Sequence, residues 1–151
     1  MTMAATSFRV ATSADVPEMQ GCRLGDEDAG EADWRMAAYL DGRHHPGQAL
    51  ASRTSFLALD DDRVVGYIAG HLTRRFRCQG ELQYLYVAPS YRRSGVARAL
   101  VRKLADWFLP QGAKKICVNA ADDSAAEFYR RVGAADLKSH WLVWDDIQSV
   151  R

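Results

Sequence analysis

The chain has 151 residues, of which 48% are hydrophobic and 26% are charged, so it has the size and composition of one ordinary globular domain with a substantial core. Its formal net charge of +1 excludes a bulk electrostatic attraction to nucleic acid or to an anionic membrane. No stretch approaches the roughly 18 apolar residues of a membrane span, and the N-terminus has no basic segment before an apolar run, so we expect a soluble, cytoplasmic protein.

The three cysteines, Cys22, Cys78 and Cys117, lie far apart and form no Cys-x-x-Cys pair. This spacing favours reduced thiols over a disulfide framework or a zinc site, and we expect no structural metal. Neither a repeat, a low-complexity segment nor a linker divides the chain. Residues 1–151 are therefore predicted to form a single domain, with its core between residues 8 and 146.

The first part of the chain predicts a strand followed by two helices. Residues 8–11 form the expected strand. Ser13 or Asp15 then offers an N-cap for a helix that runs toward Arg23. A second helix is expected over residues 32–40.

Extended segments dominate the next part. After a loop at residues 42–47, strands over residues 55–59 and 64–72 flank the acidic turn 60–62, which predicts a hairpin. A further strand covers residues 81–87. Simple alternation places Leu82, Tyr84 and Tyr86 on one face and Glu81, Gln83, Leu85 and Val87 on the other, unless a β-bulge interrupts it.

A strongly amphipathic helix is predicted over residues 95–109, and it ends at the Pro110-Gln111-Gly112 turn. A short strand follows at residues 116–118. Ser124 and Glu127 have the spacing of a capping box for another helix, which ends near Gly133, and residues 141–144 close the sheet. Strands and helices in this order predict one layered, mixed α/β (α+β) domain.

The most informative segment joins the strand at residues 81–87 to the long helix. It contains a basic turn with Gly95, immediately before the first helical residues. Amides in the first helical turn lack intrahelical partners, the helix macrodipole adds partial positive charge, and a glycine allows close approach to the backbone. The turn therefore predicts an anion site for a phosphorylated ligand, although a tight bend alone also explains a single glycine.

The sequence Arg92-Arg93-Ser94-Gly95-Val96-Ala97, together with the preceding strand and the later segment Ser124-Ala125-Ala126-Glu127-Phe128-Tyr129, resembles the acyl-CoA-binding region of the GNAT superfamily of N-acyltransferases. The family pattern Gln/Arg-x-x-Gly-x-Gly/Ala is satisfied by Arg92, Gly95 and Ala97. This resemblance implies a three-layer domain, with helices on both sides of a mostly antiparallel mixed sheet. It is specific over residues 82–133 and holds only in outline before them.

The resemblance also implies an N-acetyltransferase that uses acetyl-CoA as its acyl donor. The end of the strand would bond the pantetheine arm, the following amides would hold the pyrophosphate, and arginines would add contacts to phosphate oxygens unless they are simply solvated. The residues assigned to the cofactor in this way are Leu85, Tyr86, Val87, Arg92, Arg93, Ser94, Gly95, Val96, Ala97, Arg98 and Asp122.

Two residues are candidates for catalysis. Tyr129 stands where the family places a tyrosine near the thioester sulfur, and a phenol with a pKa of about 10 can protonate a departing thiolate, although Tyr129 can equally be a core aromatic. Glu81 begins the strand that borders the cleft and is the leading general-base candidate, with an exposed structural carboxylate as the alternative.

The sequence departs from the family pattern at three positions. Cys117 replaces a glutamate that some members carry before the tyrosine helix, which puts a simple one-residue base in doubt. Asp122 replaces an asparagine and loses its amide donor. Ala134 replaces a phenylalanine, which changes packing without an obvious chemical consequence.

The acceptor site would be built by the first two helices and nearby loops. An acidic run there lies beside Trp34 and favours a cationic amine, unless it is only solvated surface; its members are Asp26, Glu27, Asp28, Glu31 and Asp33. We assign the substrate contacts to Asp26, Glu27, Asp28 and Trp34. A small-molecule or peptide amine is the expected partner.

Other features favour simpler explanations. His44 and His45 lack a third metal ligand nearby and fit a surface loop. The three arginines around Phe76 suit a hairpin tip better than a nucleic-acid site. A Gly-x-Gly-x-x-Gly motif is absent, which argues against a dinucleotide-dependent oxidoreductase. A non-catalytic acyl-CoA sensor remains the alternative function, and the oligomeric state stays open, including a homodimer through Trp141 and Trp144.

Overall fold

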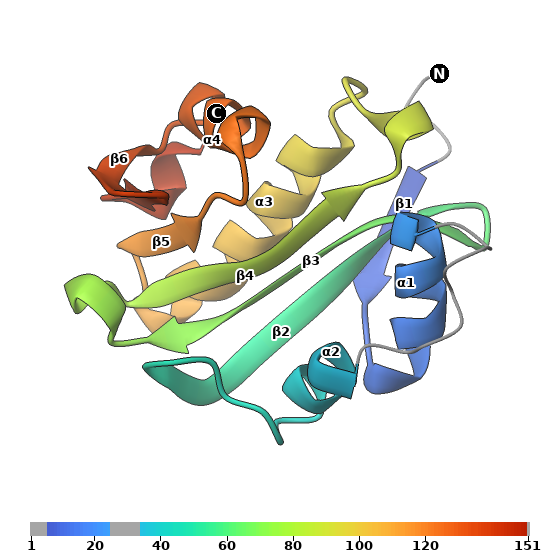
Figure 1. The fold of residues 1–151 in the computed structure, drawn as a ribbon, viewed down its shortest axis with the longest axis horizontal. Helices are drawn as coiled ribbons and strands as arrows, with labels where there is room; N and C mark the ends of the chain where they lie inside the picture. Colours follow the sequence, from blue (N-terminus) through green and yellow to red (C-terminus); the bar gives the residue numbers. More distant parts are fainter. Residues whose placement is uncertain (1–5, 25–33, 151) are drawn as a thin grey trace.

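The computed structural model describes residues 6–24 and 34–150. Within them, seven strands form one sheet in the order β1-β2-β3-β4-β5-β7-β6, and only β4 and β5 are parallel neighbours (Figure 1). The strands are β1 (Thr6–Val10), β2 (Ala49–Asp60), β3 (Arg63–Thr73), β4 (Gly80–Val87), β5 (Ile116–Asn119), β6 (Ala135–Lys138) and β7 (Trp141–Trp144). The predicted mixed α/β class with a mostly antiparallel sheet is confirmed.

Helices cover both faces of this sheet. The helices α1 (Val16–Leu24) and α2 (Trp34–Leu40) lie in front of it in Figure 1, and α3 (Val96–Phe108) lies behind. The fourth helix, α4 (Asp123–Arg131), shares its buried cluster with α3 and therefore packs on the same face. No helix in the described parts of the chain is long and apolar enough to cross a membrane.

The predicted apolar stripe of α3 is buried against the sheet; its fully buried members are Val96, Leu100, Val101, Leu104, Ala105 and Phe108. The helix can approach closely because β3 carries a glycine at the contact. A Cβ on Gly70 would lie 2.9 Å from Leu104 Cδ2 and 2.9 Å from the carbonyl oxygen of Glu81. Sequence periodicity and a missing side chain on the facing strand thus fix the position of α3.

Three sequence predictions about local structure were wrong. Strand β2 begins at Ala49 instead of residue 55, and its first part pairs irregularly with β3, so it lacks a regular alternation. Strand β6 was not predicted because it is a short, largely exposed edge strand. Helix α4 is capped by Asp122 and not by Ser124, since Asp122 Oδ1 accepts a hydrogen bond of 2.8 Å from the amide of Ala125.

Candidate active site

Strands β4 and β5 are paired at only one end. Their parallel register joins Gly80, Glu81 and Leu82 to the three residues of β5 from Ile116 to Val118, and in the described residues it goes no further. From Gln83 to Val87, β4 keeps its antiparallel partner β3 but not β5 (Figure 1). The backbone edge of this half of β4 is therefore open toward a gap in the sheet.

A β-bulge lies where the two strands separate. Leu82 pairs with Gly70 and Tyr84 pairs with Ala69, so Gln83 is the extra residue. The bulge changes the faces predicted by simple alternation. Leu82 joins Leu85 and Val87 in the cluster beneath α3, whereas Tyr84 and Tyr86 pack in the cluster beneath α1 and α2.

The segment between β4 and α3 forms the predicted basic turn. Gly95 adopts φ 89°, a left-handed conformation that favours glycine, and directly precedes Val96, the first residue of α3. No side chain of the described residues caps this helix, so its first-turn amides are left for another partner. Arg93 and Arg98 are exposed, and Ser94 is half-buried, with its hydroxyl bonded to the carbonyl oxygen of Tyr91.

Arg92 is exposed and makes two contacts within the protein. Its Nε donates a hydrogen bond of 3.0 Å to the carbonyl oxygen of Val87, and its guanidinium lies 5.4 Å from the centre of the Tyr86 ring. These contacts fasten the turn to the end of β4. They also occupy the Val87 carbonyl, one of the groups expected to bond a pantetheine arm.

Tyr129 stands on α4, which is held on the far side of the gap by its packing on β6 and β7. Its side chain is 6% exposed and makes edge-on contacts with Phe128 and Trp144. Burial raises the pKa of Tyr129, and the Asp122 carboxylate adds to the effect. The phenol therefore keeps its proton and can donate a hydrogen bond, but complete proton transfer costs more than from an exposed tyrosine.

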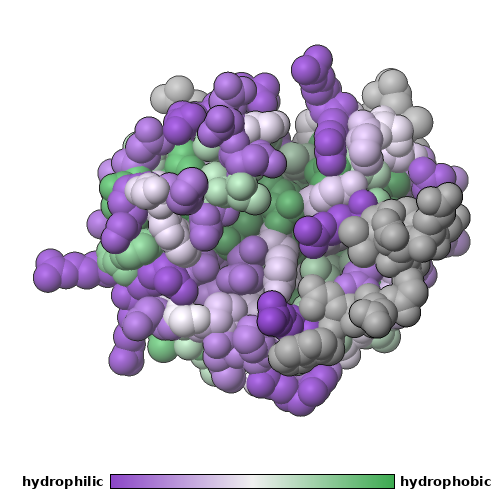
Figure 2. Space-filling model, viewed as in Figure 1, coloured by the Kyte–Doolittle hydropathy of each residue, from purple (hydrophilic) through white to green (hydrophobic). Residues whose placement is uncertain are grey.

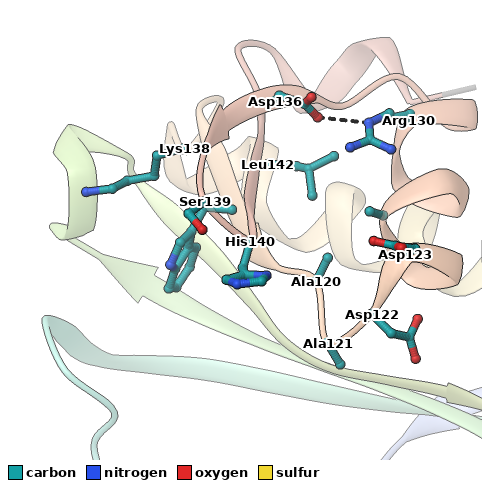
Figure 3. A pocket seen from close by; sticks show the side chains of 12 residues that line it. Ala120, Ala121, Asp122, Asp123, Arg130, Asp136, Lys138, Ser139, His140 and Leu142 are labelled. Atoms are coloured by element: carbon teal, nitrogen blue, oxygen red, sulfur yellow. Dashed lines mark hydrogen bonds and ion pairs between the residues drawn. The ribbon is translucent and has the colours of Figure 1, made fainter.

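Two hollows adjoin these elements. Figure 2 shows hydrophobic residues in a hollow between the C-terminal elements and the end of β4. A cavity of about 370 Å³ lies between the start of α4 and the β6–β7 turn. Figure 3 shows Asp122 and Asp123 on one side of it and Ser139 and His140 on the other. Asp122 is thus the predicted cofactor residue that lines this cavity, while its Oδ1 already serves as the helix cap.

Glu81 is buried, with 4% exposure, and is not the exposed carboxylate considered as its alternative. Its Oε1 accepts a hydrogen bond of 2.9 Å from Arg75 Nε, which makes an ion pair. His71, the residue paired with Glu81 across β3 and β4, places its Nε2 3.7 Å from the same oxygen. The Nδ1 of His71 lies 2.8 Å from the hydroxyl of Tyr39 on α2.

Sequence patterns did not identify His71, Tyr39 or Arg75 as site residues. The one signal for His71 was a histidine inside the otherwise apolar segment 64–72. Tyr39 and Arg75 come from elements distant in sequence, and no spacing rule connects them to Glu81. Gln83 carries a buried side-chain oxygen without a hydrogen-bond partner in the described residues, which is equally invisible to sequence patterns.

Cys117 is the residue of β5 that pairs with Glu81, and its thiol is a weak acid there. Burial raises the pKa of the Cys117 thiol, so it remains protonated and does not replace a carboxylate base. Cys22, Cys78 and Cys117 are all free cysteines in the structure. Within the described residues, no group of three or more His, Cys, Asp or Glu side chains is placed to hold a metal ion.

The acidic run at residues 26–33 lies outside the described residues, so its proposed role in acceptor binding stays a prediction. Trp34 begins α2. His45 belongs to a loop fastened by Arg53, whose Nη1 donates 2.8 Å and 3.1 Å hydrogen bonds to the carbonyl oxygens of His44 and Tyr39. The surface-loop interpretation of the two histidines fits these contacts.

Comparison with known families decides what this arrangement is. The model of the Acetyltransferase (GNAT) family matches residues 20–134, which is most of the chain. The chain belongs to the GNAT family of acetyltransferases. No curated protein matches the sequence significantly.

Solved structures share the GNAT fold over nearly the whole chain. An acetyltransferase from Thermus thermophilus is 16% identical, with 95% of this chain and 98% of that chain covered and a TM-score of 0.68. A PaiA N-acetyltransferase from Thermoplasma acidophilum, in complex with coenzyme A, is 13% identical, with 91% of this chain and 96% of that chain covered and a TM-score of 0.64. An aminoglycoside acetyltransferase from an uncultured soil metagenomic sample, in complex with sisomicin, is 16% identical, with 89% of this chain and 91% of that chain covered and a TM-score of 0.64.

Proposed function

We propose that this GNAT protein is an N-acetyltransferase that moves an acetyl group from acetyl-CoA to a primary amine by direct attack in a ternary complex. One observation carries the proposal: the uncapped N-terminus of α3, with Gly95 at φ 89°, follows the half of β4 that has lost its β5 partner. The free amides and the helix dipole at this N-terminus suit the negatively charged pyrophosphate. The open strand edge suits a pantetheine arm that bonds like an added strand.

The donor contacts follow from this geometry. The amides of residues 93–97 would hold the pyrophosphate, and the exposed Arg93 and Arg98 would add charge-assisted contacts. The backbone of Leu85 and Tyr86 would bond the pantetheine arm. Arg92 would act indirectly, by holding the turn against Val87.

The acceptor has to lose a proton before it can attack. An alkylamine with a pKa of about 10.4 lies more than 3 units above neutral pH, which costs roughly 4–5 kcal/mol. Glu81 would take this proton, directly or through one water. The amine nitrogen then bonds to the thioester carbonyl carbon, the carbon–sulfur bond breaks, and the departing thiolate receives a hydrogen bond or proton from Tyr129. The products are the amide, coenzyme A and one released proton.

The chemical class of the acceptor is best found by direct assay. One structural relative is an aminoglycoside acetyltransferase that binds sisomicin, and the predicted acidic run also favours cationic amines. We would therefore measure thiol release from acetyl-CoA across aminoglycosides, polyamines, amino acids and peptides with free N-termini. Release that depends on one class of amine supports the proposal. Binding of coenzyme A without release by any amine supports the acyl-CoA sensor instead.

Replacing Tyr129 with Phe tests the catalytic assignment on that amine. The ring remains to pack against Phe128 and Trp144, so only the hydroxyl is lost. We expect kcat to fall about 100-fold, with the Kd of coenzyme A nearly unchanged. An unchanged kcat would remove Tyr129 from the mechanism while leaving the donor site intact.

A further inference from the structure

His71 is a polar residue in an unusual place. It is 0% exposed near the C-terminal end of β3, and its Nε2 has no hydrogen-bond partner within the described residues. A buried polar nitrogen without a partner destabilises a protein, and an apolar side chain would avoid that loss. A histidine at this position therefore indicates a role other than packing.

The contacts on the two sides of the His71 ring favour one position for its proton. The Tyr39 hydroxyl lies 2.8 Å from Nδ1 and can donate to that nitrogen, whereas the opposite tautomer would turn the lone pair of Nε2 toward the Glu81 carboxylate. The Tyr39 ring is held edge-on against Tyr84 and beneath the guanidinium of Arg53, which lies 4.7 Å from the ring centre. The hydrogen of a neutral His71 is thereby placed on Nε2.

That hydrogen faces Glu81. His71 Nε2 is 3.7 Å from Glu81 Oε1, slightly beyond hydrogen-bond distance, and Arg75 Nε is 2.9 Å from the same oxygen. Within the described residues, every side-chain hydrogen bond and ion pair of Glu81 ends on Oε1. The second oxygen, Oε2, is left for a partner that comes from outside this cluster.

We propose that His71 is a positioning residue for Glu81. With Arg75, it holds Oε1 so that Oε2 is the oxygen presented to the acceptor amine or to an intervening water. This inference rests on the proposed function, in which Glu81 is the base. It adds a second residue, His71, that orients the Glu81 carboxylate. In the described parts of the chain, the charged and titratable groups that contact His71 are Tyr39 from α2 and Glu81 from β4. Behind them, Arg53 from β2 and Tyr84 from β4 contact Tyr39, and Arg75 from the short turn after β3 contacts Glu81.

The test compares His71→Leu with His71→Gln in the full chain, with an amine found active in the thiol-release assay. His71→Leu should lower kcat about tenfold, without changing the KM of acetyl-CoA, because a donor that faces a charged group is lost. His71→Gln keeps an N–H donor and should recover most of the lost kcat.

Two further measurements separate positioning from general damage to the fold. In a Glu81→Gln background, His71→Leu should lower kcat no further. Nitrogen NMR of the wild-type ring at about pH 7 should show the proton on Nε2, and Tyr39→Phe should weaken that preference. The NMR experiment needs no substrate.

Several results would overturn this inference. An equal loss of kcat in His71→Leu and His71→Gln would show a structural role, as would an additive loss in the Glu81→Gln background. A ring protonated mainly on Nδ1 would contradict the tautomer. Full activity of Glu81→Gln would overturn the positioning role alone, whereas failure to acetylate any amine would overturn the proposed function and this inference together.

Discussion

Gly95 offers the sharpest test of the predicted anion site. Its φ of 89° and ψ of 1° lie in the left-handed region, where a residue with a Cβ loses about 1–2 kcal/mol relative to glycine. Gly95→Ala must show this loss either in the free energy of unfolding or in the affinity for coenzyme A. If the turn keeps its conformation, the free energy of unfolding falls by about that amount. If the turn relaxes to negative φ, stability is kept but the amides of residues 93–97 turn away from their ligand.

In the second case the Kd of coenzyme A should rise about 5–30-fold, which corresponds to the same 1–2 kcal/mol. The sum of the two losses is therefore the predicted quantity. Urea unfolding measures the first, and isothermal titration calorimetry with coenzyme A measures the second. Because a ligand bound only to the folded state stabilises it in proportion to its affinity, the shift in melting temperature caused by coenzyme A gives an independent check.

Gly112 provides a matched control. It has φ 77° at the turn after α3, and a Cβ there would meet nothing within 4 Å. Gly112→Ala should lose a similar amount of stability and bind coenzyme A like the wild type. The reasoning is refuted if Gly95→Ala loses less than about 0.5 kcal/mol in both measurements together, or if Gly112→Ala weakens coenzyme A binding as much as Gly95→Ala does.

Three further predictions concern packing and pH. Gly80→Ala would place a Cβ 2.4 Å from Phe108 Cε1 and should lower the free energy of unfolding in urea by about 1–3 kcal/mol; wild-type stability would contradict the packing of α3 on β4. Gly21 lies inside α1, and a Cβ added there would meet no atom within 4 Å, so Gly21→Ala should instead raise the free energy of unfolding by about 0.5–1 kcal/mol. The hydrogen bond from Arg9 lowers the pKa of Asp15, so Asp15 stabilises the fold above its ordinary pKa and this contribution disappears as pH falls through the lowered value. Urea unfolding of Asp15→Asn against pH should show a deficit near neutral pH that vanishes in acid; a deficit independent of pH would contradict it.

The sequence predicted the elements that have strong internal patterns. Helix α3 agrees with its prediction within one residue at each end, because its apolar stripe, Gly95 and the Pro110 turn all point to the same boundaries. The glycine turn before α3 was predicted for the same reason, whereas its role as an anion site stays a prediction. Strand β6 escaped prediction because a four-residue edge strand with exposed side chains carries no alternation that differs from a loop.

The surroundings of Glu81 were beyond sequence reasoning for a different reason. Glu81 was chosen as a base because it begins β4, but its environment depends on the register of β3 with β4 and on where α2 packs. These are long-range contacts between residues that are neither periodic nor adjacent. The bulge at Gln83 shows the same limit, since one extra residue reverses the faces of part of β4 and neither sequence neighbour of Gln83 is a glycine or a proline.

Most sheet proteins have their unsatisfied strand edges at the outer rim, where charges, prolines or twists discourage aggregation with other chains. In this protein a comparable edge arises at the centre of the sheet, because β4 continues for five residues after its pairing with β5 ends. Helix α3 packs on the face of β4 beside this edge, and α4 packs on β6 and β7 beyond the gap (Figure 1). A half-strand at the centre of a sheet can thus stay unpaired without the protective residues that an outer strand would need.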